Sequence, residues 1–327
     1  MSSDDTNEAP IASFPDAAQS PELEDVGGEG GDEAWREAHS VGDVVRLAVG
    51  ADTARLIAHD PVARLARDPE GVHQARVATR RLRSHLSTFD SVLRHAPTTK
   101  LSRELRRLGR TLGTVRDLDV LRERFEGSVE QFEPMVRNDG VHLLDVMDAE
   151  RAVSYAALRE MMSSARYRAL LATMGAFVAD PPLREAAGQP AEPYLLVAIR
   201  ARYDALDEAV EALPATPSDP QLHEVRIIAK PARYAAELGA PILGAPCRRL
   251  SKRLADLCDE LGLLNDGARA NQWLDVAGED PTLAFAVALI RAKEIDRMIE
   301  ARAEWPRRWE RVRIAAAEMG WGEAAQA

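Results

Sequence analysis

The sequence has few cysteines, few aromatic residues and no long apolar run. Its two cysteines, Cys247 and Cys258, have no His or Cys at metal-binding spacing, and two thiols in 327 residues exclude a disulfide framework. The longest unbroken apolar run covers eight residues, 283–290, which is too short to span a bilayer, and the acidic N-terminus has no apolar signal segment. These absences predict a cytoplasmic protein with no membrane contact.

Positive charge is the minority charge, but it is concentrated in two blocks. The 42 Lys and Arg residues face 53 Asp and Glu residues, and the net charge of -11 by itself argues against an anionic partner. Residues 1–38 hold eleven acids and one arginine, a local charge of −10. Residues 72–116 have a local charge of +9 and residues 222–253 a local charge of +5. The overall average therefore hides two strongly basic segments.

Residues 1–38 are rich in Asp, Glu, Gly, Ser and Pro, which predicts a disordered acidic tail. Apolar residues then recur at spacings of three and four, which predicts an all-α protein. Pro and Gly clusters predict a helical half at 39–180, a linker at 181–193, a second half at 194–320 and a tail at 321–327. The expected helices are 40–59, 72–94, 99–113, 117–132, 137–163, 165–179, 193–212, 220–238, 246–263, 266–276, 281–302 and 304–318.

A pattern of one histidine and three cations occurs twice, at an offset of 150 residues. It has the form His-x2-Arg-x3-(Arg/Lys)-x2-Arg, and its members are His73, Arg76, Arg80 and Arg83, and then His223, Arg226, Lys230 and Arg233. At about 100° per residue these positions fall within about 80° of arc. Each copy is therefore expected to form a cationic stripe on one face of a helix, with apolar residues opposite.

The next helix of each half is expected to carry a further stripe. Its cations are Lys100, Arg103, Arg107 and Arg110 in the first half, and Arg249, Lys252 and Arg253 in the second. Like charges at helix-neighbour spacing repel by a few tenths of a kcal/mol per pair, so four stripes favour an anionic ligand. The alternative is a helical scaffold whose basic faces are solvated or paired with carboxylates.

Three strings resemble motifs of the CHAD family, a histidine-containing α-helical domain. They are VHxxRVxxRRLR at 72–83, LGxxRDxDVL at 112–121 and LHxxRxxxKxxRYxxEL at 222–238, and the resemblance covers about 40–320. It implies two pseudo-twofold-related helical bundles that form a basic central cavity or pore for inorganic polyphosphate. It also implies association with polyphosphate granules or with a separate CYTH-type triphosphatase. In two places the chain departs from the pattern: Pro231 replaces a cation, and Asn265-Asp266 replaces the Arg-Asp of Arg116-Asp117.

The stripes and the resemblance together define a set of candidate polyphosphate ligands. The set comprises His73, Arg76, Arg80, Arg81, Arg83, Lys100, Arg103, Arg107, Arg110, Arg116, His223, Arg226, Lys230, Arg233, Arg249, Lys252 and Arg253. An anion beside the two histidines would favour their protonated form, which leads to the hypothesis of tighter binding at mildly acidic pH.

The sequence gives little support for catalysis. It contains no GxxxxGK[ST], HExxH, GxSxG or ExExK string, so we expect a binding module without an active site, cofactor or metal. Asp117 is interpreted as lying at a helix start after a break at Gly113, where it caps the helix or pairs with Arg116. The alternatives are a nucleic-acid-binding helical protein, disfavoured by the scarcity of aromatic residues in the basic blocks, and a phosphate-metabolising enzyme or its accessory. For the acidic tail, solubility is the preferred role, and occupation of the cavity as a polyanion mimic is the alternative.

Overall fold

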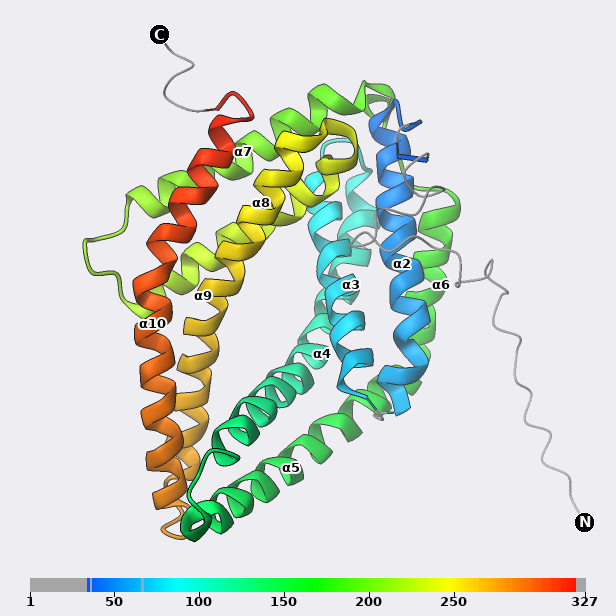
Figure 1. Cartoon of the computed structure of the whole chain (residues 1–327). Helices are drawn as coiled ribbons and strands as arrows, with labels where there is room; N and C mark the ends of the chain where they lie inside the picture. Colours follow the sequence, from blue (N-terminus) through cyan, green and yellow to red (C-terminus); the bar gives the residue numbers. More distant parts are fainter. Residues whose placement is uncertain (1–33, 36, 66–67, 322–327) are drawn as a thin grey trace, which may run out of the picture.

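The structure, a computed structural model, describes residues 34–35, 37–65 and 68–321. Most of the predicted tail at 1–38 and residues 322–327 lie outside these ranges. Within them the chain is all-α, as predicted, with two isolated β-bridges and no longer strand (Figure 1). The helices are α2 (Val41–Leu65), α3 (Pro69–Thr88), α4 (His95–Val129), α5 (Pro134–Ser163), α6 (Ala165–Ala179), the 3-10 helix η2 (Glu185–Gly188), α7 (Ala191–Glu211), α8 (Asp219–Leu243), α9 (Ala245–Ala277) and α10 (Ala284–Ala317).

Three predicted helix breaks are wrong, because three long helices replace pairs of shorter ones. The expected pairs 99–113 and 117–132, 246–263 and 266–276, and 281–302 and 304–318 are continuous in α4, α9 and α10. An interior glycine such as Gly113 costs about 1 kcal/mol relative to Ala. In α4 the buried residues recur on both sides of it, from Leu108 to Leu121, so the burial of this face outweighs the cost. Asp117 therefore lies inside α4, and its interpretation as a helix start is wrong.

Proline also ends fewer helices than expected. Pro61 lies inside α2 and Pro241 inside α8, although both were expected to end a helix. Pro231 and Pro306 lie inside α8 and α10, and both were expected at interior helix positions. The expected end of α8 at residue 238 is therefore five residues too early. Gly244 does separate two helices, because its φ of 78° is in the left-handed region that favours glycine and turns the chain from α8 into α9.

Two apolar clusters hold the helices together. The larger cluster takes buried side chains from both halves, and includes Val72 of α3, Leu222 of α8 and Leu206 of α7. The smaller cluster joins the far ends of α4 and α9 to α5 and α10, through side chains such as Phe125 and Leu274. Figure 1 shows α9 and α10 running side by side from one cluster to the other, and α5 meeting α10 at the far end.

Helices α4 and α9 pass from the first cluster into the second at equivalent positions. In α4 the first cluster ends at Val115 and the second begins at Leu121. In α9 the corresponding residues are Leu264 and Ala270. In the two intervening stretches, 116–120 and 265–269, polar side chains are only partly buried at Arg116, Asp117, Asn265 and Asp266, whereas Leu118 and Gly267 are buried. The fold is thus two pseudo-twofold-related helical bundles, in which α3 and α4 of the first half correspond to α8 and α9 of the second.

The segment predicted as a linker is held on both sides by the first half. Ser40 pairs with Pro190 and Leu93 pairs with Leu183 in the two isolated bridges. Between these contacts lies η2, whose Ala187 is buried in the larger cluster. The second half therefore starts from a fixed position beside α2.

Candidate functional site

A cavity of about 270 Å³ lies where α3, α4, α8 and α9 come together. Its walls carry five Arg and Lys side chains, two histidines and two aspartates. The lining residues are His73, Arg76, Arg116, Asp117, Val120, Leu121, His223, Arg226, Lys230, Asn265, Asp266 and Arg269. Both halves contribute equivalent groups, because His73 and Arg76 of α3 correspond to His223 and Arg226 of α8.

The repeat-related arginines Arg76 and Arg226 each lie against a glycine of the following helix. A Cβ atom built on Gly113 would lie 3.7 Å from Nε of Arg76. A Cβ built on Gly262 would lie 3.4 Å from Nη2 and 3.7 Å from Nε of Arg226. The missing side chains let both guanidinium groups lie close against the helix backbone. The two glycines therefore fix the depth at which the arginines enter the cavity.

Asp117 supplies a counter-charge inside the cavity and links the two halves. One carboxylate oxygen lies 3.4 Å from Nη2 of Arg76 on α3, and the other pairs with Nη1 of Arg269 on α9. Asp266 occupies the repeat-related position on α9 and accepts a hydrogen bond of 3.3 Å from the Asn265 amide. The positive charge of the cavity is thus only partly compensated by the protein.

The cations deepest in the site lie close enough to perturb one another. The Arg80 guanidinium stacks over the Tyr234 ring at 5.3 Å from its centroid. Burial lowers the pKa of Lys230 to about 7, helped by the positive charges of Arg226, Arg80 and Arg76. Burial likewise lowers the pKa of Arg76, although Asp117 opposes the shift. These groups hold their full positive charge most easily when an anion lies among them.

One histidine and two arginines at the site each have a buried nitrogen that the protein leaves without a hydrogen-bond partner. Burial lowers the pKa of His73, with a further contribution from the charge of Arg116, so this imidazole is held neutral. Among the described residues, Nδ1 of His223 and Nε of both Arg80 and Arg226 are buried without a hydrogen-bond partner. Buried polar groups are usually paired, so unpaired donors around a cationic cavity are typical of a binding site.

Seven of the seventeen predicted ligands come together. Six line the cavity, namely His73, Arg76, Arg116, His223, Arg226 and Lys230, and Arg80 lies next to them. The other ten do not line it. Of these, Arg81 and Arg233 form ion pairs with Glu237, at 3.0 and 2.6 Å, and Arg233 also lies 3.4 Å from Asp259. Glu237 thus holds α3 and α8 together.

The predicted stripes on α4 and α9 lie outside the cavity. Lys100, Arg103, Arg107, Arg110 and Lys252 have exposed side chains. Arg249 pairs with Glu318, Arg253 lies 3.2 Å from Asp256, and half-buried Arg83 lies beside Arg106, whose charge together with burial lowers the Arg83 pKa. The regular spacing therefore identified cationic faces, but of the four predicted stripes only those of α3 and α8 contribute side chains to the cavity.

Four polar cavity residues were absent from the predicted set: Asp117, Asn265, Asp266 and Arg269. Asp117 and Asp266 were visible as members of a repeated Arg/Asn-Asp pair, at an offset of 149 residues that nearly equals the histidine repeat. Arg269 follows Asp266 by three residues and so lies on the same helix face. The repeat-related position of α4 carries no cation, so the repeat gave no indication of Arg269.

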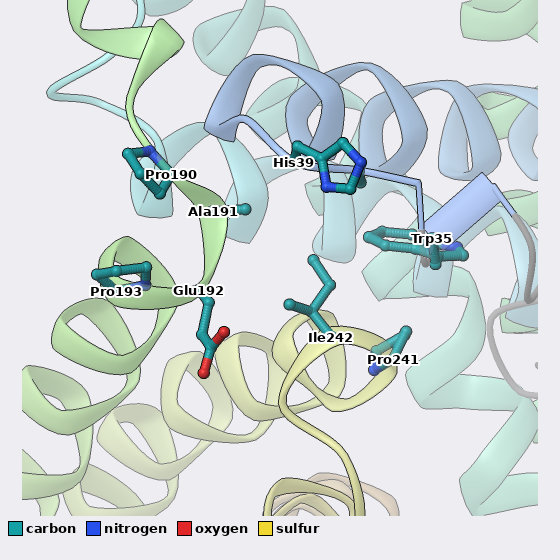
Figure 2. Close-up of a pocket in the computed structure, with 9 residues that line it drawn as sticks. Trp35, His39, Pro190, Ala191, Glu192, Pro193, Pro241 and Ile242 are labelled. Carbon is teal, nitrogen blue, oxygen red and sulfur yellow. The ribbon is translucent and has the colours of Figure 1, made fainter.

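A second hollow, of about 510 Å³, lies between the start of α2, the start of α7 and the end of α8 (Figure 2). Its walls carry the Trp35 and His39 rings, several prolines and the Glu192 carboxylate, with no Arg or Lys. Its chemistry does not suit an anion, so of these two hollows the cationic cavity is the candidate site for a phosphate ligand. In the described ranges no group of three or more His, Cys, Asp or Glu side chains is arranged to hold a metal ion.

The fold and the cavity define an all-helical protein of two related halves with a basic central chamber. The chain belongs to the CHAD domain family, whose model matches residues 47–275. The resemblance noted in the sequence is thus confirmed. None of the helices in the described ranges is long and apolar enough to cross a membrane.

Two solved structures and two curated sequences are similar to this chain. PptA from Streptomyces chartreusis has a TM-score of 0.67 and 21% identity, covering 83% of this chain and 99% of that one. The CHAD domain from the plant Ricinus communis has a TM-score of 0.70 and 24% identity, covering 84% and 92%. Two Mycobacterium tuberculosis proteins described as uncharacterized, MT2285 and Rv2226, are each 28% identical over 268 residues. These are 78% of this chain and 50% of each relative, so the chain spans about half the length of the curated relatives it matches.

Proposed function

We propose that the cavity binds inorganic polyphosphate and that the chain is a binding module without an active site of its own. The observation that carries the proposal is the convergence of cations from four helices of both halves into one cavity, where only two aspartates oppose them. The unpaired donors of His223, Arg226 and Arg80 support it, because an anionic ligand would supply their acceptors.

Phosphate suits this set of donors better than a single carboxylate does. A guanidinium group can contact two phosphate oxygens at once, and an ammonium or imidazolium group adds a compact donor. Polyphosphate carries roughly one negative charge per phosphate along a flexible chain. The two halves present the same donors twice, as a ligand built from repeating units requires.

A matched pair of variants tests where the ligand binds. The cavity variant combines Arg76→Gln, Arg226→Gln and Lys230→Gln, and the surface variant combines Lys100→Gln, Arg103→Gln and Arg107→Gln. At about pH 6, where Lys230 with its pKa of about 7 is mostly protonated, both variants lose three positive charges, so general electrostatic attraction falls nearly equally. Each phosphate contact changes the slope of log K against log salt by about 0.7, so the cavity variant should lose about 2 from the slope, and most of its affinity.

The surface variant should keep most of its affinity and its slope. Equal losses in both variants would show that polyphosphate binds by general attraction, and would contradict the proposal. Competition with RNA and single-stranded DNA at the same salt separates a polyphosphate module from a nucleic-acid-binding protein. Phosphate release from long-chain polyphosphate with Mg²⁺ present would instead identify an enzyme.

The physiological setting is a further part of the proposal. Binding at polyphosphate granules in the cytoplasm, or presentation of polyphosphate to a separate CYTH-type triphosphatase, would use the same cavity. Both stay predictions, which co-localisation with granules and co-purification with such a triphosphatase would test.

A further inference from the structure

Lys230 is placed unlike the other three lysines of the chain. It lines the cavity from α8, whereas Lys100 and Lys252 are exposed and Lys293 donates a 2.6 Å hydrogen bond to Gln131. No carboxylate in the described ranges forms an ion pair with Lys230 at 4.0 Å or less. Its amine is therefore open to a small molecule that enters the cavity.

The charged groups around Lys230 are mostly cations. Arg226 is on its own helix, Arg76 and Arg80 face it from α3, and the buried thiol of Cys258 faces it from α9. Together with burial, the arginines lower the Lys230 pKa to about 7, while Cys258 acts weakly in the opposite sense. An ordinary lysine has a pKa of about 10.4, so at neutral pH about half of Lys230 is the neutral amine, against less than about 0.1% for an ordinary lysine.

A neutral amine beside guanidinium groups is suited to react with an anionic acylating agent. The cavity, at about 270 Å³, is just below the size of typical small-molecule sites, which begin at about 300 Å³. Arg76 and Arg226 can hold a phosphate group there by charge-assisted hydrogen bonds. A reactive carbonyl attached to that phosphate would then lie near the amine.

We propose that Lys230 is a site of covalent acylation by acyl phosphates, which the surrounding arginines hold beside its amine. This inference rests on the proposed function, since it uses the same affinity for phosphate. The Nζ lone pair forms a bond to the carbonyl carbon, and the bond between that carbon and the bridging oxygen breaks. The bridging oxygen leaves with the bonding electron pair as part of inorganic phosphate, which takes up the proton lost from the nitrogen. The products are an amide and hydrogen phosphate.

Acylation changes the ligand site, because it replaces a group that can become cationic with a neutral amide. Polyphosphate, when bound, favours the protonated amine and blocks access to it. The modification and the ligand therefore compete: polyphosphate protects Lys230, and acylated protein binds polyphosphate about tenfold more weakly, the loss expected for one charge-assisted contact.

The experiment treats the full chain with acetyl phosphate and measures acetylation of each lysine by mass spectrometry. Lys230 should be acetylated at least about tenfold faster than Lys100 or Lys252 at pH 7.5, because a far larger fraction of it is neutral. Its rate should level off above about pH 8, while the rates at the exposed lysines continue to rise. Saturating polyphosphate should suppress labelling at Lys230 alone. Lys230→Gln should reproduce the weaker binding of the acetylated protein, and Lys230→Arg should keep the affinity.

A neutral acyl donor, the N-hydroxysuccinimide ester of acetic acid, separates amine reactivity from recruitment by the arginines. The advantage of Lys230 should shrink with this reagent, and an undiminished advantage would overturn the role of the arginines. Acetylation of Lys230 no faster than that of Lys100 would overturn the whole inference. A polyphosphate titration of the same preparation before acetylation separates the outcomes. Binding without selective acetylation refutes only this inference, and absence of binding by the unmodified protein refutes the proposed function.

Discussion

Replacement of Gly262 by alanine should make the protein more stable and its ligand binding weaker at the same time. Glycine inside a helix costs about 1 kcal/mol relative to alanine, so Gly262→Ala should raise the free energy of unfolding by up to about 1 kcal/mol. The new Cβ would lie 3.4 Å from Nη2 of Arg226, which is tighter than most such contacts. The guanidinium must therefore move by a few tenths of an ångström. A charge-assisted hydrogen bond contributes about 1.5–3 kcal/mol, and partial loss of one gives about a fivefold weaker affinity.

Two other glycines provide matched controls for this substitution. At Gly113 the nearest guanidinium atom, Nε of Arg76, would lie at 3.7 Å, an ordinary contact, so Gly113→Ala should weaken binding less. At Gly127, also inside α4, no described atom lies within 4 Å of the added carbon, so only the helix is affected. Thermal unfolding and polyphosphate titration of the three variants give both quantities. If the Gly262→Ala variant binds polyphosphate as tightly as the Gly127→Ala variant, the close contact between the Arg226 guanidinium and Gly262 is not needed for binding.

Three further predictions concern protonation, an ion pair and the thiols. Because the Lys230 pKa is lowered to about 7 in the folded protein and is about 10.4 unfolded, the unfolded chain binds more protons between these values. Stability of the ligand-free protein should therefore rise with pH from about 7 to 10, and polyphosphate affinity should fall by about tenfold in all as the Lys230 amine loses its charge. Lys230→Arg should remove both effects, and slopes unchanged in that variant would contradict this assignment. Glu237→Gln should destabilise the protein by about 2 kcal/mol in chemical denaturation through loss of its ion pairs with Arg81 and Arg233, less than the about 3–5 kcal/mol of fully buried pairs, because the Glu237 side chain is 20% exposed; an unchanged midpoint would show that these pairs contribute nothing. Burial raises the pKa of Cys247 to about 12 and of Cys258 to about 11, so iodoacetamide at pH 8 should label neither in the native protein and both in denaturant, and rapid native labelling would disagree with their burial.

The cavity set of α3 and α8 could be predicted because the sequence repeats it. His73 and His223, with the cations that follow them, have apolar residues on the opposite helix face, so their polar faces share one direction in each half. A pseudo-twofold fold then brings the two faces together. Helical period and repeat offset predicted the two faces, whereas their meeting in one cavity was what the family resemblance implied.

The stripe on α4 could not be placed in this way. Its cations from Lys100 to Arg110 lie opposite Leu101, Leu105 and Leu108, which pack into the larger cluster, but helical period does not say what lies beyond the polar face. The cavity begins only where α4 leaves that cluster, at Arg116. This transition depends on which helices pack around each end, and that is a property of the tertiary structure.

The predicted helix breaks were wrong for a related reason. Gly113 is a breaker by local propensity, and its neighbours gave no sign that Arg76, 37 residues earlier in the chain, rests on it. The same holds for Asp117, whose partners Arg76 and Arg269 come from two other helices. In both cases the long-range partner decides the role of the residue.

The larger apolar cluster, shared between both halves, has a consequence for how such a chain could have arisen. The cluster takes buried side chains from both halves, so a single half on its own would expose the part of it that the other half covers. A homodimer of two identical halves would cover those side chains again, and in it one histidine and its cations would face their own copies across a true symmetry axis. In a single chain the two copies are free to differ, as Arg116-Asp117 and Asn265-Asp266 do.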